Sequence, residues 1–179
     1  MNHVLKILAL TLLFTGCTTG APPDIKVVQN FDVDRYLGTW YEIARLDHSF
    51  ERGMSNVTAQ YSLNDNGTIR VLNKGYIDSK GTWDDAEGKA KFRGLETEGS
   101  LKVSFFGPFY GGYHIIELSE EYEYVMIAGP SKNYLWILAR NPNLDNATYQ
   151  TLVNKADDLG FPTQELIKIS HDKAKKDIN

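Results

Sequence analysis

A chain of 179 residues, 42% of them hydrophobic, holds enough apolar material for one domain with a sizeable core, so disorder of the whole chain is excluded. The formal net charge is −4, and acidic and basic residues are interspersed. The only basic cluster, at Lys173, Lys175 and Lys176, lies in the C-terminal tail, where charges are expected to be solvated. Because nucleic acids are bound through positive surfaces, the charge pattern predicts no nucleic-acid partner.

The N-terminus has the features of an export signal. His3 and Lys6 precede an apolar run over residues 7–14, which is too short to cross a bilayer, since a spanning helix needs about 20 apolar residues. The only cysteine, Cys17, follows two small residues at the end of this run, where a signal peptidase would cut. With one cysteine, the fold cannot depend on an internal disulfide.

The segment that ends at Cys17 resembles the lipobox of bacterial lipoproteins, although Phe14 stands where that motif prefers Leu. The resemblance implies a signal peptide over residues 1–16 and a covalent lipid anchor on Cys17, made of an S-diacylglycerol and an N-acyl group such as palmitate. Thr18 stands where lipoproteins of the inner membrane tend to have Asp, so the resemblance implies the periplasmic face of the outer membrane. A plain secretory signal followed by a stray cysteine is the alternative.

Residues 17–30 are expected to tether the anchor to the folded part. Gly20, Pro22 and Pro23 suggest a short, semi-stiff segment between Thr18 and the domain. At about 3.3 Å per residue such a segment reaches roughly 20 Å, which keeps the domain near the lipid surface.

From Phe31 onward, short segments of alternating apolar and polar residues are separated by turn residues, which is typical of an antiparallel all-β domain. The first strand is expected over residues 38–46, and Asn66-Gly67 supplies a hairpin turn. Eight such strands at regular spacing predict an up-and-down meander that closes into a barrel, which removes both sheet edges. The second strand is expected at residues 57–63, the third begins at residue 68, and the fourth ends at residue 92. The last four are expected at residues 101–105, 114–118, 124–128 and 134–140.

The last third of the chain has a helical period instead. Asp145 is a suitable N-cap, and Gly160 and Pro162 end the segment, so we expect one amphipathic helix over about residues 145–159. This helix is expected to cover the outside of the barrel where strands are apolar on both faces. One face of it carries Tyr149, Leu152, Val153, Ala156 and Leu159. The barrel domain is thus expected over residues 31–170, with a basic tail at 171–179.

Two motifs carry a resemblance to a known family. Gly38-Thr39-Trp40 resembles the GxW signature of lipocalins, and the run 135–140 resembles their third motif, which ends in an arginine, here Arg140. A second motif is represented only weakly, at residues 120–122. The resemblance implies an eight-stranded lipocalin barrel, closed at one end by Trp40 beneath Arg140. Within that family, the chain is similar to the bacterial outer-membrane lipoproteins and to the apolipoprotein D-like members. A guanidinium over an indole ring contributes about 0.5–2 kcal/mol.

The apolar face of each strand is expected to point into the barrel and to line a ligand cavity. Trp136 and Leu138 share the parity of Arg140, and His114 and Ile116 lie on the face without Glu117, so these four are placed inside as well. A structural hydrogen bond is the alternative role for His114. The other predicted interior residues are Ala59, Tyr61, Leu63, Ile69, Val71, Leu101, Val103 and Phe105.

This lining, together with the family resemblance, predicts a lipid-binding protein that stores or transports a fatty acid or lysophospholipid in membrane biogenesis, maintenance or repair. A filled barrel with a structural or chaperone-like role is the alternative, because eight strands enclose either packed side chains or one small ligand. A homodimer remains possible. The spacing typical of metal sites is absent among His48, His114 and His171. The acidic residues Asp47, Asp84 and Asp85 are expected on turns, where they are solvated more often than catalytic. We therefore expect no enzymatic activity, no metal site and no cofactor.

Overall fold

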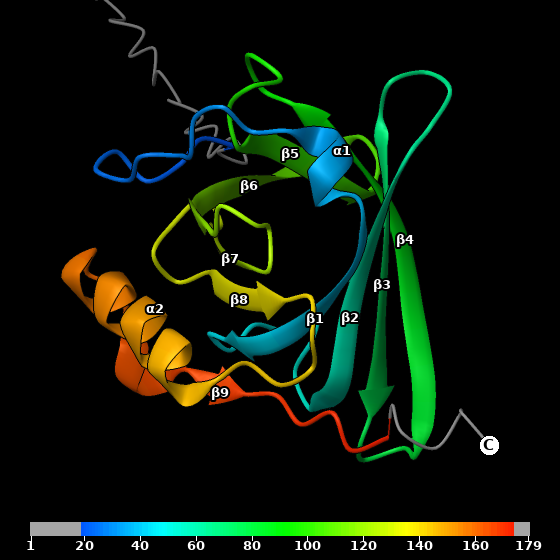
Figure 1. The fold of residues 1–179 in the computed structure, drawn as a ribbon. Helices are drawn as coiled ribbons and strands as arrows, with labels where there is room; N and C mark the ends of the chain where they lie inside the picture. Colours follow the sequence, from blue (N-terminus) through cyan, green and yellow to red (C-terminus); the bar gives the residue numbers. More distant parts are fainter. Residues whose placement is uncertain (1–18, 174–179) are drawn as a thin grey trace, which may run out of the picture.

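The computed structural model describes residues 19–173, which form an antiparallel β-barrel with one helix packed on its outside (Figure 1). The expected signal peptide, Cys17 and the tail beyond Lys173 lie outside the described residues. The elements in order are α1 (Val33–Tyr36), β1 (Gly38–Arg45), β2 (Met54–Leu63), β3 (Ile69–Ile77), β4 (Thr82–Phe92), β5 (Ser100–Phe106), β6 (Phe109–Leu118), β7 (Tyr124–Ala128), β8 (Leu135–Ala139), α2 (Asn146–Asp158), a 3-10 turn (Thr163–Glu165) and β9 (Ile167–Lys168).

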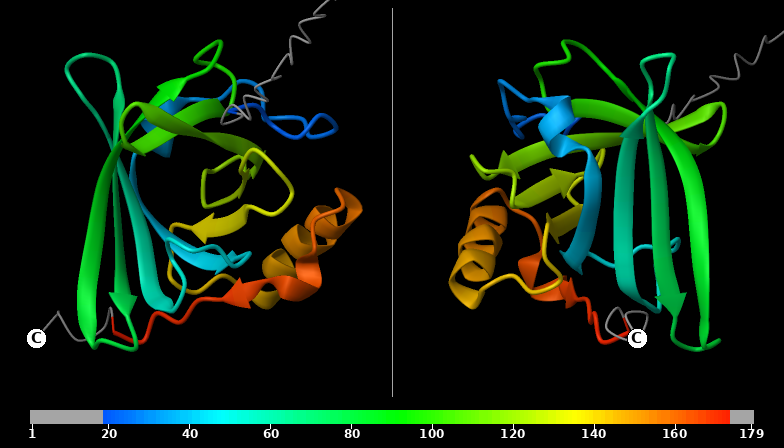
Figure 2. Two further views of the ribbon diagram at one scale, coloured as in Figure 1. Left: turned by 180° about the vertical axis from the view of Figure 1, so that it is seen from behind. Right: turned by 45° about the vertical axis from the view of Figure 1, so that its right-hand side comes forward.

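Each strand from β2 to β7 pairs with the next one in antiparallel fashion, and β1 pairs with both β2 and β8. These two pairings of β1 close the barrel, so the predicted eight-stranded meander is confirmed. The long strands β2 to β4 run across the direction of β5 to β8 (Figure 2). The short strand β9 adds to β1 at Ala44 and Arg45.

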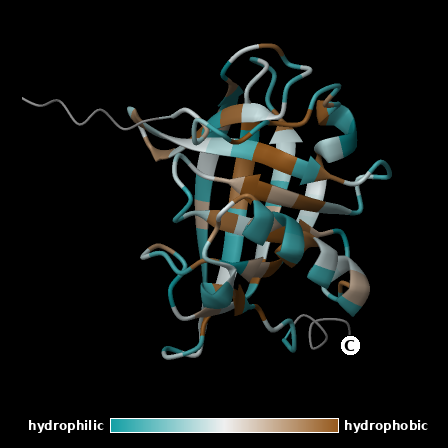
Figure 3. Cartoon of the chain, turned by 90° about the vertical axis from the view of Figure 1, so that its left-hand side faces the viewer, coloured by the Kyte–Doolittle hydropathy of each residue, from teal (hydrophilic) through white to brown (hydrophobic). Residues whose placement is uncertain are grey.

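The barrel wall is apolar on both sides where α2 covers it. In β7, Val125 and Ile127 belong to the interior cluster, whereas Met126 and Ala128 belong to a second cluster between the wall and α2. All four side chains are fully buried. Figure 3, seen from the side of α2, shows the hydrophobic segments of these strands. The strands whose sequences are apolar on both faces are therefore the ones that lie between the barrel interior and α2.

The ends of α2 follow from the capping residues. The side chain of Asp145 accepts a hydrogen bond from the backbone N–H of Thr148 at 2.9 Å, which satisfies an otherwise unpaired donor of the first turn. Gly160 has a φ of +77° directly after the helix, a conformation that glycine adopts without strain. The predicted helix is confirmed to within one residue at each end. No helix among residues 19–173 is long and apolar enough to span a membrane.

The segment expected to be a tether lies along the barrel from Thr19 onward, so that expectation is wrong for the described part. Val28 donates to the carbonyl of Ile115 at 2.9 Å and accepts from Gly99 at 3.0 Å. Ile25 is buried in the cluster beneath α2. Apolar side chains and paired backbone groups fix the segment, and its Gly and Pro content gave no sign of them.

We predict that Leu152→Ala lowers the free energy of unfolding by about 2–4 kcal/mol, because it opens a cavity between α2 and the wall, where Leu152 is 3% exposed. Urea unfolding followed by fluorescence measures the change. Gln150→Ala, on the exposed side of the same helix, is the control and should change stability by less than about 0.5 kcal/mol. Equal effects of both substitutions would contradict the described packing of α2.

Candidate ligand-binding barrel

Most of the predicted cavity residues do face the interior. Four of them, Ala59, Val103, Phe105 and Trp136, pack against the interior cluster yet are only partly buried. Side chains that point inward and still have accessible surface leave room for contact with a guest. The remaining inward residues, fully buried within the same cluster, are Tyr61, Ile69, Val71, Leu101 and Leu138. Leu63, by contrast, lies at the end of β2 and is 46% exposed, so its predicted interior position is wrong.

His114 and Ile116 are also predicted wrongly, since both lie on the outer face of β6. Ile116 belongs to the cluster beneath α2, and Ile115 takes the inward position. A bulge between Ile115 and Glu117 shifts the register of β6 against β7. Ile116 and Glu117 therefore lie on the same face, and a prediction that assumed strict alternation from Glu117 put Ile116 on the wrong side. His114 is held between Ser100 Oγ, 3.2 Å from Nδ1, and the carbonyl of Thr19, 3.1 Å from Nε2.

Three tyrosines meet inside the barrel above its closed end. The hydroxyl of Tyr113 lies 2.5 Å from that of Tyr36 and 2.9 Å from that of Tyr61. Burial raises the pKa of Tyr36 and Tyr113 well above the usual value and that of Tyr61 to about 12, so the hydroxyls stay protonated. Sequence reasoning missed Tyr36 and Tyr113, although Tyr113 shares the parity of Ile115 on β6.

The closed end has the arrangement that the GxW resemblance implies. The guanidinium carbon of Arg140 lies 3.9 Å from the ring centre of Trp40. Arg140 also donates to the carbonyls of Arg35, Thr39 and Tyr122 at 2.7, 3.0 and 3.3 Å. A Cβ at Gly38, which has a φ of +96°, would lie 3.3 Å from the Arg140 side chain, so glycine leaves the room that Arg140 needs.

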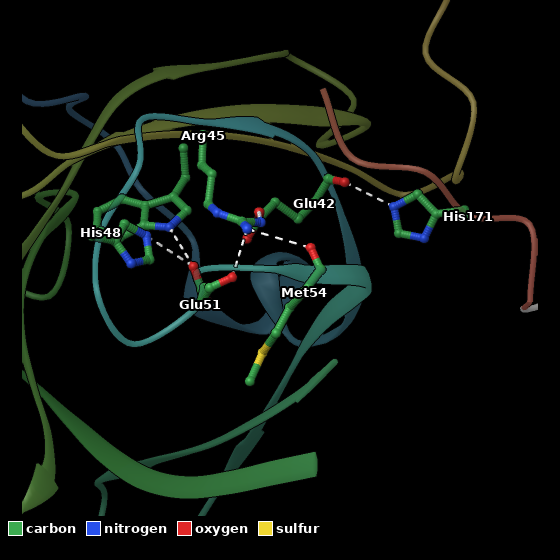
Figure 4. Close-up of polar contacts among 7 residues, drawn as sticks. Glu42, Arg45, His48, Glu51, Met54 and His171 are labelled. Carbon is green, nitrogen blue, oxygen red and sulfur yellow. Dashed lines mark hydrogen bonds and ion pairs between the residues drawn. The ribbon is translucent and has the colours of Figure 1, made fainter. Parts of the chain in front are cut away.

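A buried polar network ties the loop between β1 and β2 to the inner wall (Figure 4). Arg45 donates to the Glu42 carboxylate and to the Glu51 carbonyl, both at 2.6 Å. The Glu51 carboxylate lies 2.9 Å from His48 Nε2 and accepts from Trp136 Nε1 at 3.1 Å. A bulge in β1 after Glu42 allows Glu42 and Arg45 to share the inner side. Simple alternation could not predict this network.

The two carboxyl groups of this network differ in their protonation. Burial, and then the charge of Glu51, raises the pKa of Glu42 to about 8. Burial also acts on Glu51, but the hydrogen bond and charge of His48 outweigh it and lower its pKa. At neutral pH the Glu51 carboxylate is therefore ionised beside His48, whereas the Glu42 carboxyl group, which accepts from Arg45, holds its proton more tightly than a free glutamate does.

The other residues weighed as acid–base or metal groups lie apart. Asp47 pairs with Arg52 at the surface, 2.7 Å from its guanidinium, and Asp84 and Asp85 are exposed on β4. His171 Nε2 lies 2.8 Å from the carbonyl of Glu42. Within residues 19–173 no group of three or more His, Cys, Asp or Glu side chains is placed to share a metal ion.

Comparison with known proteins identifies the family. A family model described as a lipocalin-like domain matches residues 31–171. The chain belongs to the lipocalins. It is 51% identical over 156 residues to the Outer membrane lipoprotein Blc of Escherichia coli (strain K12), which covers 87% of this chain and 88% of that protein. A protein of the same name from Vibrio cholerae is 48% identical over 170 residues, 94% of this lipocalin and 98% of the relative.

More distant relatives share the fold of this lipocalin. Rat (Rattus norvegicus) apolipoprotein D is 35% identical over 149 residues, 78% of each chain. The cockroach allergen Per a 4 has a TM-score of 0.67 at 20% identity and covers 89% of this lipocalin and 98% of its own chain. Insecticyanin from the tobacco hornworm Manduca sexta has a TM-score of 0.67 at 22% identity, with coverage of 88% and 89%. The predicted family is thus confirmed.

We predict that the unfolding free energy contributed by Glu42 falls as the pH rises from 4.5 toward about 8, because its raised pKa makes the folded state hold a proton that the unfolded chain releases. The loss is about 1 kcal/mol per pH unit within this window. Urea unfolding at several pH values, compared with Glu42→Gln, measures it. His114 and His171, whose pKa values burial lowers, contribute the opposite slope in both proteins, so the difference isolates Glu42. Identical slopes would refute the raised pKa.

We predict that Arg140→Lys destabilises the protein by about 1–3 kcal/mol, because an ammonium cannot cover Trp40 and reach three carbonyls at once. Thermal unfolding with tryptophan fluorescence measures this. Arg35→Lys is the matched control, since Arg35 donates to Glu120 at an exposed site and should cost less than about 1 kcal/mol. An Arg140→Lys protein as stable as wild type would contradict the role of the guanidinium.

Proposed function

We propose that the barrel binds a fatty acid or lysophospholipid and stores or transports it. The observation that carries the proposal is the set of inward side chains with accessible surface, Ala59, Val103, Phe105 and Trp136. Such a lining suits an extended hydrocarbon chain, since it gains contact area without needing directed hydrogen bonds. The family relationship supports a binding role for hydrophobic ligands.

The two ends of the interior differ in a way that suits an amphipathic guest. One end is sealed by Trp40 and Arg140, so an acyl chain has no exit there. Toward the loop between β1 and β2, Trp136 is held by Glu51, which belongs to the buried network with Arg45. A ligand would place its hydrocarbon tail toward Trp40 and its polar group toward this network. We further assign the role of cavity lining to Tyr61, Ile69, Val71 and Leu138.

We propose that this lipocalin is lipid-anchored through Cys17 at the periplasmic face of the outer membrane and serves membrane biogenesis, maintenance or repair there. Two observations support the location: relatives about half identical are named outer membrane lipoproteins, and Cys17 ends a lipobox-like segment. An S-diacylglycerol and an N-acyl group on that cysteine would hold the protein stably, because two or more acyl chains anchor where one binds only reversibly.

A binding protein fits better than an enzyme. Each histidine within residues 19–173 is engaged in a structural contact: His48 with Glu51, His114 with Ser100 and Thr19, and His171 with the carbonyl of Glu42. The family relationship points the same way. The second candidate function, a filled barrel with an envelope-structural role, differs in one measurable respect, since it would hold no lipid.

We predict that mass spectrometry of the purified protein detects a bound fatty acid or lysophospholipid, and that Val103→Trp weakens lysophospholipid binding about tenfold or more, because an indole fills the space along β5. Titration with quenching of tryptophan fluorescence measures the affinity. Gln60→Trp, on the exposed outer face of β2, is the control and should bind as wild type does. A protein without copurified lipid whose fluorescence is unchanged by added lipid would establish the filled barrel instead.

A further inference from the structure

The outer face of β4, β5 and β6 carries a cluster of cations that the binding function does not use. Lys91 of β4 stands directly opposite Lys102 of β5, and Lys89 stands opposite Ser104. Like charges directly opposite each other destabilise a strand pair, so this arrangement has a cost within the isolated molecule. We call the surface formed by Lys89, Lys91, Arg93 and Lys102 the basic face.

The cations of the basic face are not neutralised by the protein. None of the ion pairs among residues 19–173 includes any of these four side chains. Lys102 lies over the ring of Tyr110, 5.2 Å from its centre. Of the nearby acids, Glu87 is paired with Arg70 at 2.6 Å, and Glu98 lies beside Gly94 without an ion pair to Arg93. The face therefore presents positive charge to something outside the chain.

The N-terminal segment meets the barrel at this same face. Thr19 packs closely on Gly112, since a Cβ added at Gly112 would lie only 2.9 Å from the carbonyl oxygen of Thr19. Gly112 in turn is the cross-strand partner of Lys102. Arg93 Nε donates to Thr19 Oγ1 at 3.3 Å. Figure 1 shows the segment from Thr19 running beside β5 and β6. Since Cys17 is only two residues earlier, the backbone at the proposed attachment point is no more than about 7 Å from that of Thr19.

Three exposed apolar side chains border the basic face. Phe106 and Phe109, at the tip of the hairpin between β5 and β6, are 80% and 69% exposed, and Leu95, two residues after Arg93, is 66% exposed. A hollow of about 370 Å³ opens on the same wall, with Lys89, Ser104 and Gly107 in its lining. The Ser104 hydroxyl is buried and has no hydrogen-bond partner. Exposed aromatics beside lysines are typical of a surface that contacts lipid headgroups.

We propose that the basic face docks on the anionic headgroups of the bilayer that holds the acyl anchor, so that the barrel lies with its β4–β6 wall against the membrane. Lys91 and Lys102 contact lipid phosphates, which removes their mutual repulsion, and Phe106 and Phe109 enter the headgroup region. The proposal rests on acylation of Cys17, which is part of the proposed function. It goes further, because an anchor only two residues before Thr19 and a docking surface beside Thr19 together give the barrel one orientation.

The test uses the full-length acylated protein with one free cysteine, at Phe109→Cys on the face or at Lys80→Cys on the turn between β3 and β4. Each carries an environment-sensitive fluorophore, and the protein is placed in vesicles of phosphatidylcholine with or without phosphatidylglycerol, plus lipids with a nitroxide headgroup. We expect quenching at position 109 to exceed that at position 80 at least about threefold in anionic vesicles, and to weaken in about 0.5 M salt.

The charge variant carries both Lys91→Glu and Lys102→Glu. Because two glutamates opposite each other repel as the two lysines do, the variant keeps a repulsive cross-strand pair and changes only the charge of the face. It should reduce quenching at position 109 to the level at position 80. Lys74→Glu with Lys80→Glu changes the net charge equally, away from the basic face, and should leave quenching at position 109 unaltered. Thermal unfolding checks that all variants are folded.

Three results would overturn docking: equal quenching at both positions, quenching independent of phosphatidylglycerol, or a Lys91→Glu, Lys102→Glu protein that is quenched like wild type. If that variant instead turns a dimer into a monomer with no effect of lipid charge, the face is an interface between copies and the membrane proposal is wrong. Intact mass reports acylation separately: a Cys17 without acyl groups would refute the anchor and the docking together, whereas acylated protein without docking refutes only the latter.

Discussion

The closure of the barrel depends on β1, which pairs on one edge with β2, the next strand in the chain, and on the other edge with the distant β8. Its partners β2 and β8 hold it along Gly38 to Arg45, so the side chains of β1 are fixed with respect to both halves of the wall. Trp40 is thereby placed at the base of the interior, and the bulge after Glu42 turns Arg45 inward. A strand held on both edges cannot shift register without breaking two ladders at once. The closed end of the barrel and the buried polar network therefore both depend on the position of β1.

The wall that separates interior from exterior is stabilised from both sides. Val125 and Ile127 pack inward, while Met126 and Ala128 pack under α2. The outer cluster under α2 buries apolar area in addition to that of the interior cluster, and this burial stabilises the wall. On the inner side of the same wall, Trp136 is partly accessible.

The charges of the molecule are used differently inside and outside. Inside, the Arg45 guanidinium donates to the Glu42 carboxyl group and to the Glu51 carbonyl, because a buried charge without polar partners would cost several kcal/mol. Outside, Lys91 and Lys102 face each other without an acidic partner, which is tolerable only where water or another phase screens them. The proposed lipid site within the barrel and the proposed membrane contact of its outer wall thus use opposite faces of the same closed sheet.

The sequence by itself determined the elements whose signals are local. Alternation and turn residues predicted the strands, Asp145 and Gly160 bounded α2, and the GxW segment with Arg140 predicted the sealed end. Local pattern failed where a neighbouring strand sets the register: a bulge in β6 puts Ile116 on the outer face, and a bulge in β1 brings Arg45 to the same side as Glu42. The path of residues 19–30, the tyrosine cluster and the basic face were likewise decided only by tertiary structure. Each joins residues far apart in the chain, and a periodicity counted along one strand contains no information about what lies across it.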